Sequence, residues 1–298
     1  MNEWSLFQRI FLTRSGIKVV NVPLYRLRLA THYGHQQVKF QKQDTGIYVQ
    51  ILIVIPSRYD SSRFPGKSLA DIHGKPMIQH VYERSCQSGC TDRVVVATDD
   101  RRIADKVTGF GGEVMMTAPD HPSGTDRVVE VSQRIRADIY INVQGDEPLI
   151  RPDDINLLAR TMVDDPSCQV GTLCHPIAIE EAMNTNTVKM IVSHTGSVLY
   201  FSRGLIPYIS GTAYQPEYLK HIGIYAFRAE VLAKYMLLPS SDLENREKLE
   251  QLRLLQSDIP IKAVRTSRTG PGVDTPACLE RVKKIMAREY ERHTGLAN

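Results

Sequence analysis

Apolar runs and amphipathic stretches alternate along residues 49–148 of this chain. The run 51–56 (ILIVIP) is continuously apolar and rich in β-branched residues, as is typical of a strand buried on both faces. The segment 75–89 places its apolar residues on one helical stripe, with a proline near its start and a glycine at its end. The same patterns predict three more strands and two more helices: strands over 93–100, 113–117 and 138–148, a short helix that ends near Gly109, and a helix over 124–136.

The second half of the chain has a different pattern of predicted strands and helices. Strand-like segments follow one another there with few helices between them, at 170–177, 188–193, 197–203 and 221–228. Helical patterns cover 229–237, 245–257 and about 275–293. Alternating strands and helices predict a mostly parallel sheet covered by helices, and the later strands predict a smaller antiparallel lobe. With no clear linker, residues 49–298 are expected to form one α/β domain of two lobes.

The first 48 residues differ from the rest in charge. They hold seven Lys and Arg against two acids, a net charge of +5, while the whole chain has a net charge of +4. The segment shows no sustained helical or alternating period. It is therefore interpreted as a basic N-terminal extension, with a targeting peptide, a surface-bound tail and a poorly ordered extension all left open.

Composition narrows the function classes. Residues 49–298 carry a net charge of −1, so nucleic acid is not the expected partner. No run of 18 apolar residues is present, which argues against a membrane-spanning helix. The five cysteines are scattered without CxxC spacing, so neither a zinc site nor a disulfide framework is predicted and a reducing compartment fits best.

Polar clusters follow three of the predicted strands, at 57–67, 98–100 and 144–148. Ligands of open α/β sheets bind at the carboxyl ends of strands. The first cluster holds Arg58, Arg63 and Lys67, which repel one another unless an anion lies among them. Carboxylates at the other strand ends could hold Mg²⁺, so the arrangement predicts a metal–triphosphate site. Gly66 would let the backbone approach a phosphate, whereas no GxGxxG or P-loop motif is present.

Each of these residues also has an ordinary structural interpretation. The three cations could be solvated surface charges. Asp146 could be a turn residue, because Gly-Asp is common in turns, and Asp274 could cap the last helix. His221 could be a structural histidine of a strand. On the residues alone, a metal site and these alternatives both remain open.

Several motifs, in this order along the chain, resemble those of one family. They are IPSRYDSSRFPGKSL, IHGKPMIQHV, VVVATDD, HPSGTDR, INVQGDEPLI, VKMIV, LYFSRGLIP, KHIGIYAFR, KLEQLRLL and GVDTPACLERV. Together they resemble the 3-deoxy-manno-octulosonate (Kdo) cytidylyltransferases, from about Ile51 to Met286. The combination of QGDEP, HIGIY and LEQLR favours this branch over the sialic-acid cytidylyltransferases. Ser57 stands where the family often has alanine, and the N-terminal extension is the main departure.

The resemblance implies a Rossmann-like nucleotidyltransferase fold, a homodimer, and the use of CTP and Mg²⁺ to make CMP-Kdo for lipopolysaccharide synthesis in the cytoplasm. It also assigns roles to residues. Those implied for the CTP phosphates are Arg58, Arg63 and Lys67; for cytidine, Ser123 and Gly124; for Mg²⁺, Asp146 and Asp274; and for the sugar acid, Arg127, Gln144, His221, Tyr225, Glu250 and Gln251. Arg58, Lys67, Asp146 and Asp274 are the residues implied in catalysis.

Three alternatives remain at this point. The same reaction on 8-amino-Kdo is one, because the two sugars differ only at their far end. A metal-dependent glycosyltransferase would share a two-lobed fold, but it usually carries a DxD pattern where this chain has QGDEP. A non-catalytic relative would have no reason to keep three repelling cations in one loop.

Overall fold

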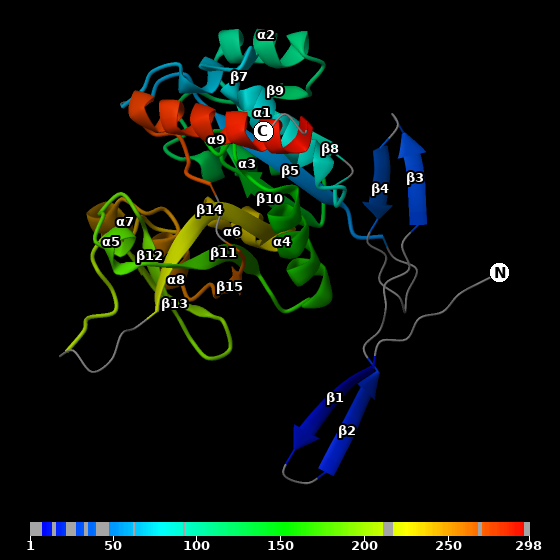
Figure 1. The fold of residues 1–298 in the computed structure, drawn as a ribbon, viewed down its shortest axis with the longest axis vertical. Coiled ribbons are helices and arrows are strands. Elements are labelled where there is room, and N and C mark those ends of the chain that lie inside the picture. Colours follow the sequence, from blue (N-terminus) through cyan, green and yellow to red (C-terminus); the bar gives the residue numbers. More distant parts are fainter. Residues whose placement is uncertain are drawn as a thin grey trace.

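The structure is a computed structural model, and it describes residues 48–61, 63–91, 93–210, 217–267 and 270–294 together with four strands before residue 40. Figure 1 shows a body built around one twisted sheet with helices on both faces. The four early strands form two antiparallel hairpins, β1 (Gln8–Thr13) with β2 (Gly16–Asn21) and β3 (Arg28–His32) with β4 (His35–Lys39). The sequence pattern did not predict these hairpins. The division of the chain near residue 48 stays a prediction.

The first half of the sheet is parallel, as predicted. Strand β5 (Ile51–Ser57) lies between β8 (Arg93–Thr98) and β10 (Ile139–Val143), and β9 (Val114–Met116) follows β8. All seven residues of β5 are buried, which explains its continuously apolar sequence. Since the strands run in one direction, the segments that follow β5, β8 and β10 meet at one edge of the sheet.

The second half continues the same sheet in antiparallel fashion. The long strand β14 (Tyr218–Arg228) pairs with β10 through its end and with β11 (Val170–Ile177) along its length. It also pairs with β12 (Lys189–Val192), which pairs with β13 (Val198–Ser202), while β15 (Ile261–Arg265) lies parallel to β11. The predicted antiparallel lobe is thus an extension of one nine-stranded sheet.

Two apolar layers hold the helices to the sheet. On one face, Ile53 and Ile55 of β5 pack in a cluster with residues of α1 (Met77–Gln87), α2 (Arg101–Gly109) and α4 (Pro152–Asp164). On the other face, Leu52 and Val54 pack with residues of α3 (Gly124–Arg134), α6 (Ala229–Tyr235) and α8 (Leu252–Gln256). Each fully buried side chain of this size contributes about 1.5–3 kcal/mol. These layers fix the edge where the polar clusters lie.

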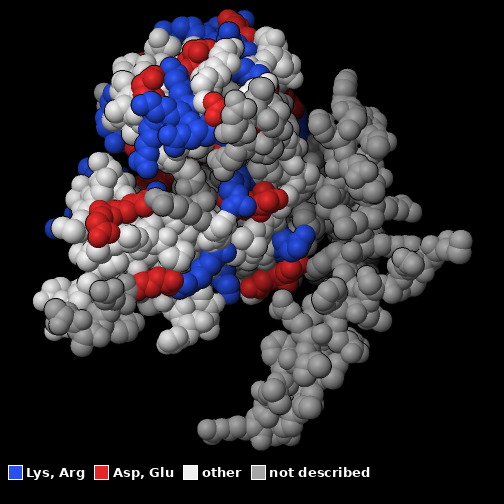
Figure 2. Space-filling model, viewed as in Figure 1, with Lys and Arg blue, Asp and Glu red and all other residues white. Residues whose placement is uncertain are grey.

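The C-terminal helix α9 (Pro276–Thr294) closes a third, smaller apolar cluster. Its residues Leu279 and Val282 pack with Leu149, Val273 and the residues around the short hairpin β6 (Asp71–Ile72)–β7 (Lys75–Pro76). This packing brings the segment before α9, which carries Asp274, next to the turn that follows β10. Figure 2 shows basic side chains gathered over the α9 region and both charge signs elsewhere on that face.

Some predicted elements differ from the observed ones. The predicted helix over 245–257 is two helices, α7 (Asp242–Glu247) and α8, because Lys248 adopts φ 55° and ends the first of them. Helix α4, strand β15 and the single turn α5 (Ile179–Ala182) were not predicted from the sequence pattern. Within the described part of the chain, none of the helices combines the length and apolar character needed to cross a bilayer.

Candidate active site

A cavity of about 150 Å³ lies at the carboxyl ends of β5 and β10. It is lined by the segment after β5, the start of α3 and the turn after β10. Seven of the residues implied by the motifs line it: Arg58, Lys67, Ser123, Gly124, Arg127, Gln144 and Asp146. The polar clusters after β5 and β10 thus meet at this cavity, whereas residues of the third cluster, 98–100, are not among its lining residues.

Lys67 joins two carboxylates beside this cavity. Its Nζ lies 2.5 Å from Oδ2 of Asp146 and 3.6 Å from Oδ1 of Asp274, and it also donates to the carbonyl oxygen of Val273 at 3.2 Å. The Lys67 side chain is 14% exposed. The carboxylates are brought together by a backbone hydrogen bond of 2.8 Å from the N–H of Val273 to the carbonyl of Asp146. Two carboxylates that share one cation form the kind of donor set that can also hold a divalent metal ion.

The other two cations of the loop after β5, Arg63 and Arg58, have surroundings that differ from those of Lys67. Arg63 forms an ion pair of 2.8 Å with Asp274. Arg58 is exposed at the cavity and has no hydrogen bond or ion pair with any described residue, so its guanidinium is available to an anion. Gly66 adopts φ +71°, and a Cβ there would lie 3.0 Å from the ring of Tyr59. The turn and this ring therefore explain the glycine, and its predicted approach to a phosphate stays untested.

Ser123 and Gly124 lie where α3 begins. The Ser123 side chain accepts from the N–H of Asp126, and the Asp126 carboxylate accepts from the N–H of Ser123, which makes a capping box. A Cβ at Gly124 would lie 3.2 Å from Cγ of Pro56, and one at Gly145 would lie 2.9 Å from the carbonyl oxygen of Pro56. The lack of side chains at both positions lets the two loops approach the end of β5 closely.

A chain of hydrogen bonds links the cavity to the residues implied for the sugar. The Gln144 amide donates to Asn142, Asn142 donates to Thr125, and the Thr125 hydroxyl donates to Oε1 of Glu250 at 2.9 Å. The other carboxylate oxygen of Glu250 is buried without a partner among the described residues. Burial raises the pKa of Glu250, and the neighbouring Asp126 raises it further. Gln251, next in the chain, is also buried.

His221 and Tyr225 lie on β14 with their rings 5.3 Å apart. Burial lowers the pKa of His221 to about 3, so its imidazole is neutral. Thr172 donates its one hydroxyl proton to the carbonyl of Ile224 at 2.8 Å, so Nε2 of His221, 3.1 Å from the same hydroxyl, acts as the donor. Nδ1 of His221 is then an acceptor without a described partner. The hydroxyl of Tyr225 is buried and likewise has no partner in the described part.

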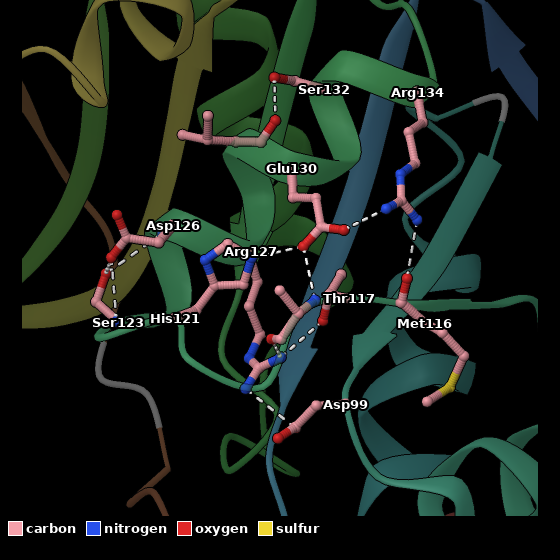
Figure 3. Close-up of polar contacts among 12 residues, drawn as sticks. Asp99, Met116, Thr117, His121, Ser123, Asp126, Arg127, Glu130, Ser132 and Arg134 are labelled. Atoms are coloured by element: carbon pink, nitrogen blue, oxygen red, sulfur yellow. Dashed lines mark hydrogen bonds and ion pairs between the residues drawn. The ribbon is translucent and has the colours of Figure 1, made fainter.

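Arg127 is held by protein groups on several sides. Its guanidinium pairs with Asp99 at 3.0 Å and donates to the Thr117 hydroxyl at 2.7 Å and to the Ala118 carbonyl at 3.0 Å (Figure 3). Only 4% of its side chain is exposed, although it lines the cavity. Contact of Arg127 with a sugar acid stays a prediction.

Comparison with known proteins shows the family to which this chain belongs. A family model described as cytidylyltransferase matches residues 52–261, which is more than two thirds of the chain. The chain belongs to the cytidylyltransferase family. It is 56% identical over 238 residues to the 3-deoxy-manno-octulosonate cytidylyltransferase of Escherichia coli, a match that covers 80% of this chain and 96% of that protein. The relative of the same name from Syntrophotalea carbinolica is 50% identical over 244 residues, covering 79% and 98%.

Solved structures agree with this assignment. The structure of CMP:2-keto-3-deoxy-manno-octonic acid synthetase complexed with CTP matches with a TM-score of 0.78 at 55% identity, covering 80% of this chain and 99% of that one. A cytidylyltransferase from Leptospira borgpetersenii, 17% identical with a TM-score of 0.56 over 80% of this chain and 87% of that one, shares the fold. The predicted family resemblance, the α/β nucleotidyltransferase fold and the nucleotidyltransferase class are thus confirmed.

The structure also adds residues that the sequence analysis did not single out in this cytidylyltransferase. Glu147 follows Asp146, and burial together with the charges of Asp146 and Asp274 raises its pKa to about 8. It therefore carries a proton at neutral pH, which limits repulsion among three neighbouring carboxyl groups. Thr125 and Asn142 connect the two parts of the site, and Asp99 anchors Arg127. Asp99 and Glu147 belong to quoted motifs, but their contacts become visible only in the fold.

The neutral state of His221 predicts a difference in acid stability. The unfolded chain binds a proton at this histidine below its ordinary pKa of 6.5, whereas the folded chain does so only below about 3. The contribution of the neutral His221 to the free energy of unfolding is therefore fully present above pH 6.5 and is lost as the pH falls toward 3. We expect the free energy of unfolding of the wild type to fall about 1–2 kcal/mol more than that of His221→Gln between pH 6.5 and 5. Denaturant titrations at both pH values measure this, and equal losses in the two proteins would contradict the burial argument.

Proposed function

We propose that this cytidylyltransferase transfers CMP from CTP to 3-deoxy-manno-octulosonate, giving the CMP-sugar and pyrophosphate. The observation that carries the proposal is the cluster of Lys67, Asp146 and Asp274 beside a cavity that Arg58 also lines. Relatives named for this sugar acid, and a solved structure complexed with CTP, support the same pair of substrates.

In this proposal the cations of the loop after β5 bind the triphosphate. Arg58 has no described partner and is free to pair with a phosphate. Lys67 lines the cavity, and both Lys67 and Arg63 pair with Asp274, so together they would neutralise charge on the leaving pyrophosphate. Ser123 and Gly124, at the beginning of α3, would hold the cytidine.

Asp146 and Asp274 fit the Mg²⁺ that the family resemblance implies. Both lie within 3.6 Å of the Lys67 ammonium, so the site already gathers two carboxylates around one positive charge. Mg²⁺ typically takes one or two carboxylates, with waters and substrate oxygens completing its shell. When bound, the ion would supply charge neutralisation at the phosphates and acidify a coordinated hydroxyl.

The sugar acid would lie on the side of the cavity that faces β14. Tyr225 and Glu250 each present a buried oxygen without a described partner, and Nδ1 of neutral His221 is an acceptor. Such groups gain hydrogen bonds when a polyhydroxylated ligand enters, which favours that ligand over an apolar one. Gln144, Gln251 and Arg127 are the remaining proposed contacts.

In this reaction the protein would contribute mainly by positioning the two substrates and by neutralising charge. The oxygen of the anomeric hydroxyl attacks the α-phosphorus and its proton passes to water, an O–P bond to the sugar forms, and the bond between the α-phosphorus and the oxygen of the leaving pyrophosphate breaks. The cavity residues would hold the two substrates in line and exclude alternative nucleophiles, which can supply much of the rate acceleration. We further propose that the enzyme acts in the cytoplasm as a homodimer, as the family resemblance implies.

Pyrophosphate release from the purified protein, with CTP and Mg²⁺, tests this function. Parallel reactions would contain Kdo, 8-amino-Kdo, N-acetylneuraminate or no sugar. We expect release with Kdo at least about tenfold faster than with N-acetylneuraminate. The ratio of Kdo to 8-amino-Kdo rates decides between these two sugars. Equal slow release in all four reactions, from folded protein, would overturn the proposed function.

A further inference from the structure

Helix α3 presents a charged face to the segment that precedes it. Arg127, Glu130 and Arg134 are spaced three and four residues apart, so they lie on one side of the helix. Figure 3 shows these side chains directed toward the segment that carries Met116, Thr117 and His121. This segment connects β9 to α3, and its last residues, Pro122 and Ser123, line the active-site cavity.

Glu130 is the centre of this contact. Its Oε2 accepts the backbone N–H of Ala118 at 2.8 Å and lies 2.5 Å from Nε2 of His121, while its Oε1 accepts from Arg134 at 2.5 Å. Only 12% of the Glu130 side chain is exposed. Burial raises the pKa of Glu130, but the Ala118 N–H, His121 and Arg134 outweigh this and hold the pKa below its usual value. Glu130 is therefore a carboxylate that accepts from three donors.

The segment depends on α3 for its conformation. The backbone of Ala118 is bound on both sides, because its N–H bonds to Glu130 and its carbonyl accepts from Arg127 at 3.0 Å. Pro119 and Pro122 have no N–H, and the N–H of Thr117 bonds to Thr98 at the end of β8. Hydrogen bonds from side chains of α3 thus hold this segment, whereas a strand would be held by backbone hydrogen bonds to a neighbouring strand.

We propose that Glu130 is a positioning residue for CTP: it holds the 117–122 segment in the conformation that places Pro122 and Ser123 at the nucleotide. Glu130 need not touch the nucleotide itself. A displacement of Ala118 and His121 would be transmitted to Pro122, which lies one residue beyond His121, and then to the N-terminal end of α3. This inference rests on the proposed binding of CTP in the same cavity.

The substitution Glu130→Gln tests this role with little change in shape. An amide offers one acceptor oxygen in place of two. In either orientation its NH₂ group faces a donor, the guanidinium of Arg134 or the N–H of Ala118. We expect the dissociation constant for CTP, measured by calorimetry without sugar, to rise about tenfold, because small misplacements of binding groups cost that much or more. The KM for the sugar acid should stay within about twofold of the wild-type value.

A second variant, His121→Gln, acts on the half-buried loop side of the same contact and leaves α3 unchanged. We expect it to weaken CTP binding about threefold, and the double variant to bind CTP no more weakly than Glu130→Gln alone, because both changes break one contact. Glu83→Gln is the matched control, since Glu83 forms an ion pair with Lys75 on the opposite face of the sheet. It should bind CTP as the wild type does.

The outcomes separate this inference from the proposed function. If wild-type protein does not bind CTP, the proposed function itself fails. If the wild type binds CTP and Glu130→Gln binds it within twofold of the wild type, whatever the change in melting temperature, Glu130 has a structural role only and the positioning role is wrong. Fully additive losses in the double variant would also overturn it.

Discussion

Asp146→Asn is expected to lower kcat for pyrophosphate release about 1,000-fold, because preorganised charges at the reacting phosphate usually account for effects of this size. The amide has the shape of the carboxylate but not its charge. It therefore removes one of the two carboxylates that share the Lys67 ammonium and that would hold Mg²⁺. Steady-state rates of pyrophosphate release at saturating CTP, Kdo and Mg²⁺ would determine kcat.

The fold should survive this change. The Asp146 side chain is 30% exposed and lies in a turn rather than in an apolar layer, so we expect the melting temperature to change by only a few degrees. Asp153→Asn provides the matched control, because it removes the same charge from a side chain that is 84% exposed on α4. That control should keep wild-type turnover. An Asp146→Asn variant with turnover within tenfold of the wild type would rule out the metal and catalytic roles of Asp146.

Lys67→Gln should lower kcat/KM for CTP about 100- to 1,000-fold. In the structure, Lys67 is the cation closest to Asp146, and it also pairs with Asp274. Its loss removes positive charge from the triphosphate side of the cavity and leaves two carboxylates repelling each other. Steady-state kinetics with varied CTP would show both a higher KM and a lower kcat.

The geometry of the site also predicts that arginine will not replace Lys67. The Lys67 side chain is 14% exposed, and its ammonium bonds within 3.2 Å to both Asp146 and the carbonyl of Val273, a space that suits a compact cation better than a planar guanidinium. We expect Lys67→Arg to remain at least about tenfold below the wild type. Lys75→Gln, a change to an exposed lysine paired with Glu83, is the control and should leave kcat/KM for CTP at the wild-type value. Wild-type kcat/KM in Lys67→Gln would contradict the phosphate-binding role.

Much of the parallel half of the fold could be predicted from sequence because its signals are local. The run at β5 is apolar at every position since both of its faces are covered, and α3 begins at a capping box that is visible in the sequence. The missed helix α4 also carried a signal, with Pro152 at its first turn, two acids after it, and Ile155 and Leu158 buried on one stripe. The sequence gives a weaker signal for the break between α7 and α8, because this break depends on Lys248 adopting a left-handed conformation that few non-glycine residues adopt.

The site could be predicted in outline and not in its contacts. The strand ends placed Arg58, Lys67 and Asp146 at one edge of the sheet, which follows from parallel topology alone. The ion pair of Lys67 with Asp274 joins residues more than 200 positions apart, and its geometry depends on how α9 packs over Leu149. The same holds for the proton on Glu147 and for the contact of Glu130 with Ala118, which arise from burial and from tertiary packing.

The most direct test of the central claim follows the phosphorus atoms of CTP. Wild-type protein would be incubated with Kdo, Mg²⁺ and CTP labelled either at the α- or at the γ-phosphorus, and the products would be separated. The proposed reaction predicts that the α label appears in the CMP-sugar and the γ label in pyrophosphate, in equal amounts. Release of the γ label as orthophosphate, with no label transferred to the sugar, would contradict the proposed CMP transfer.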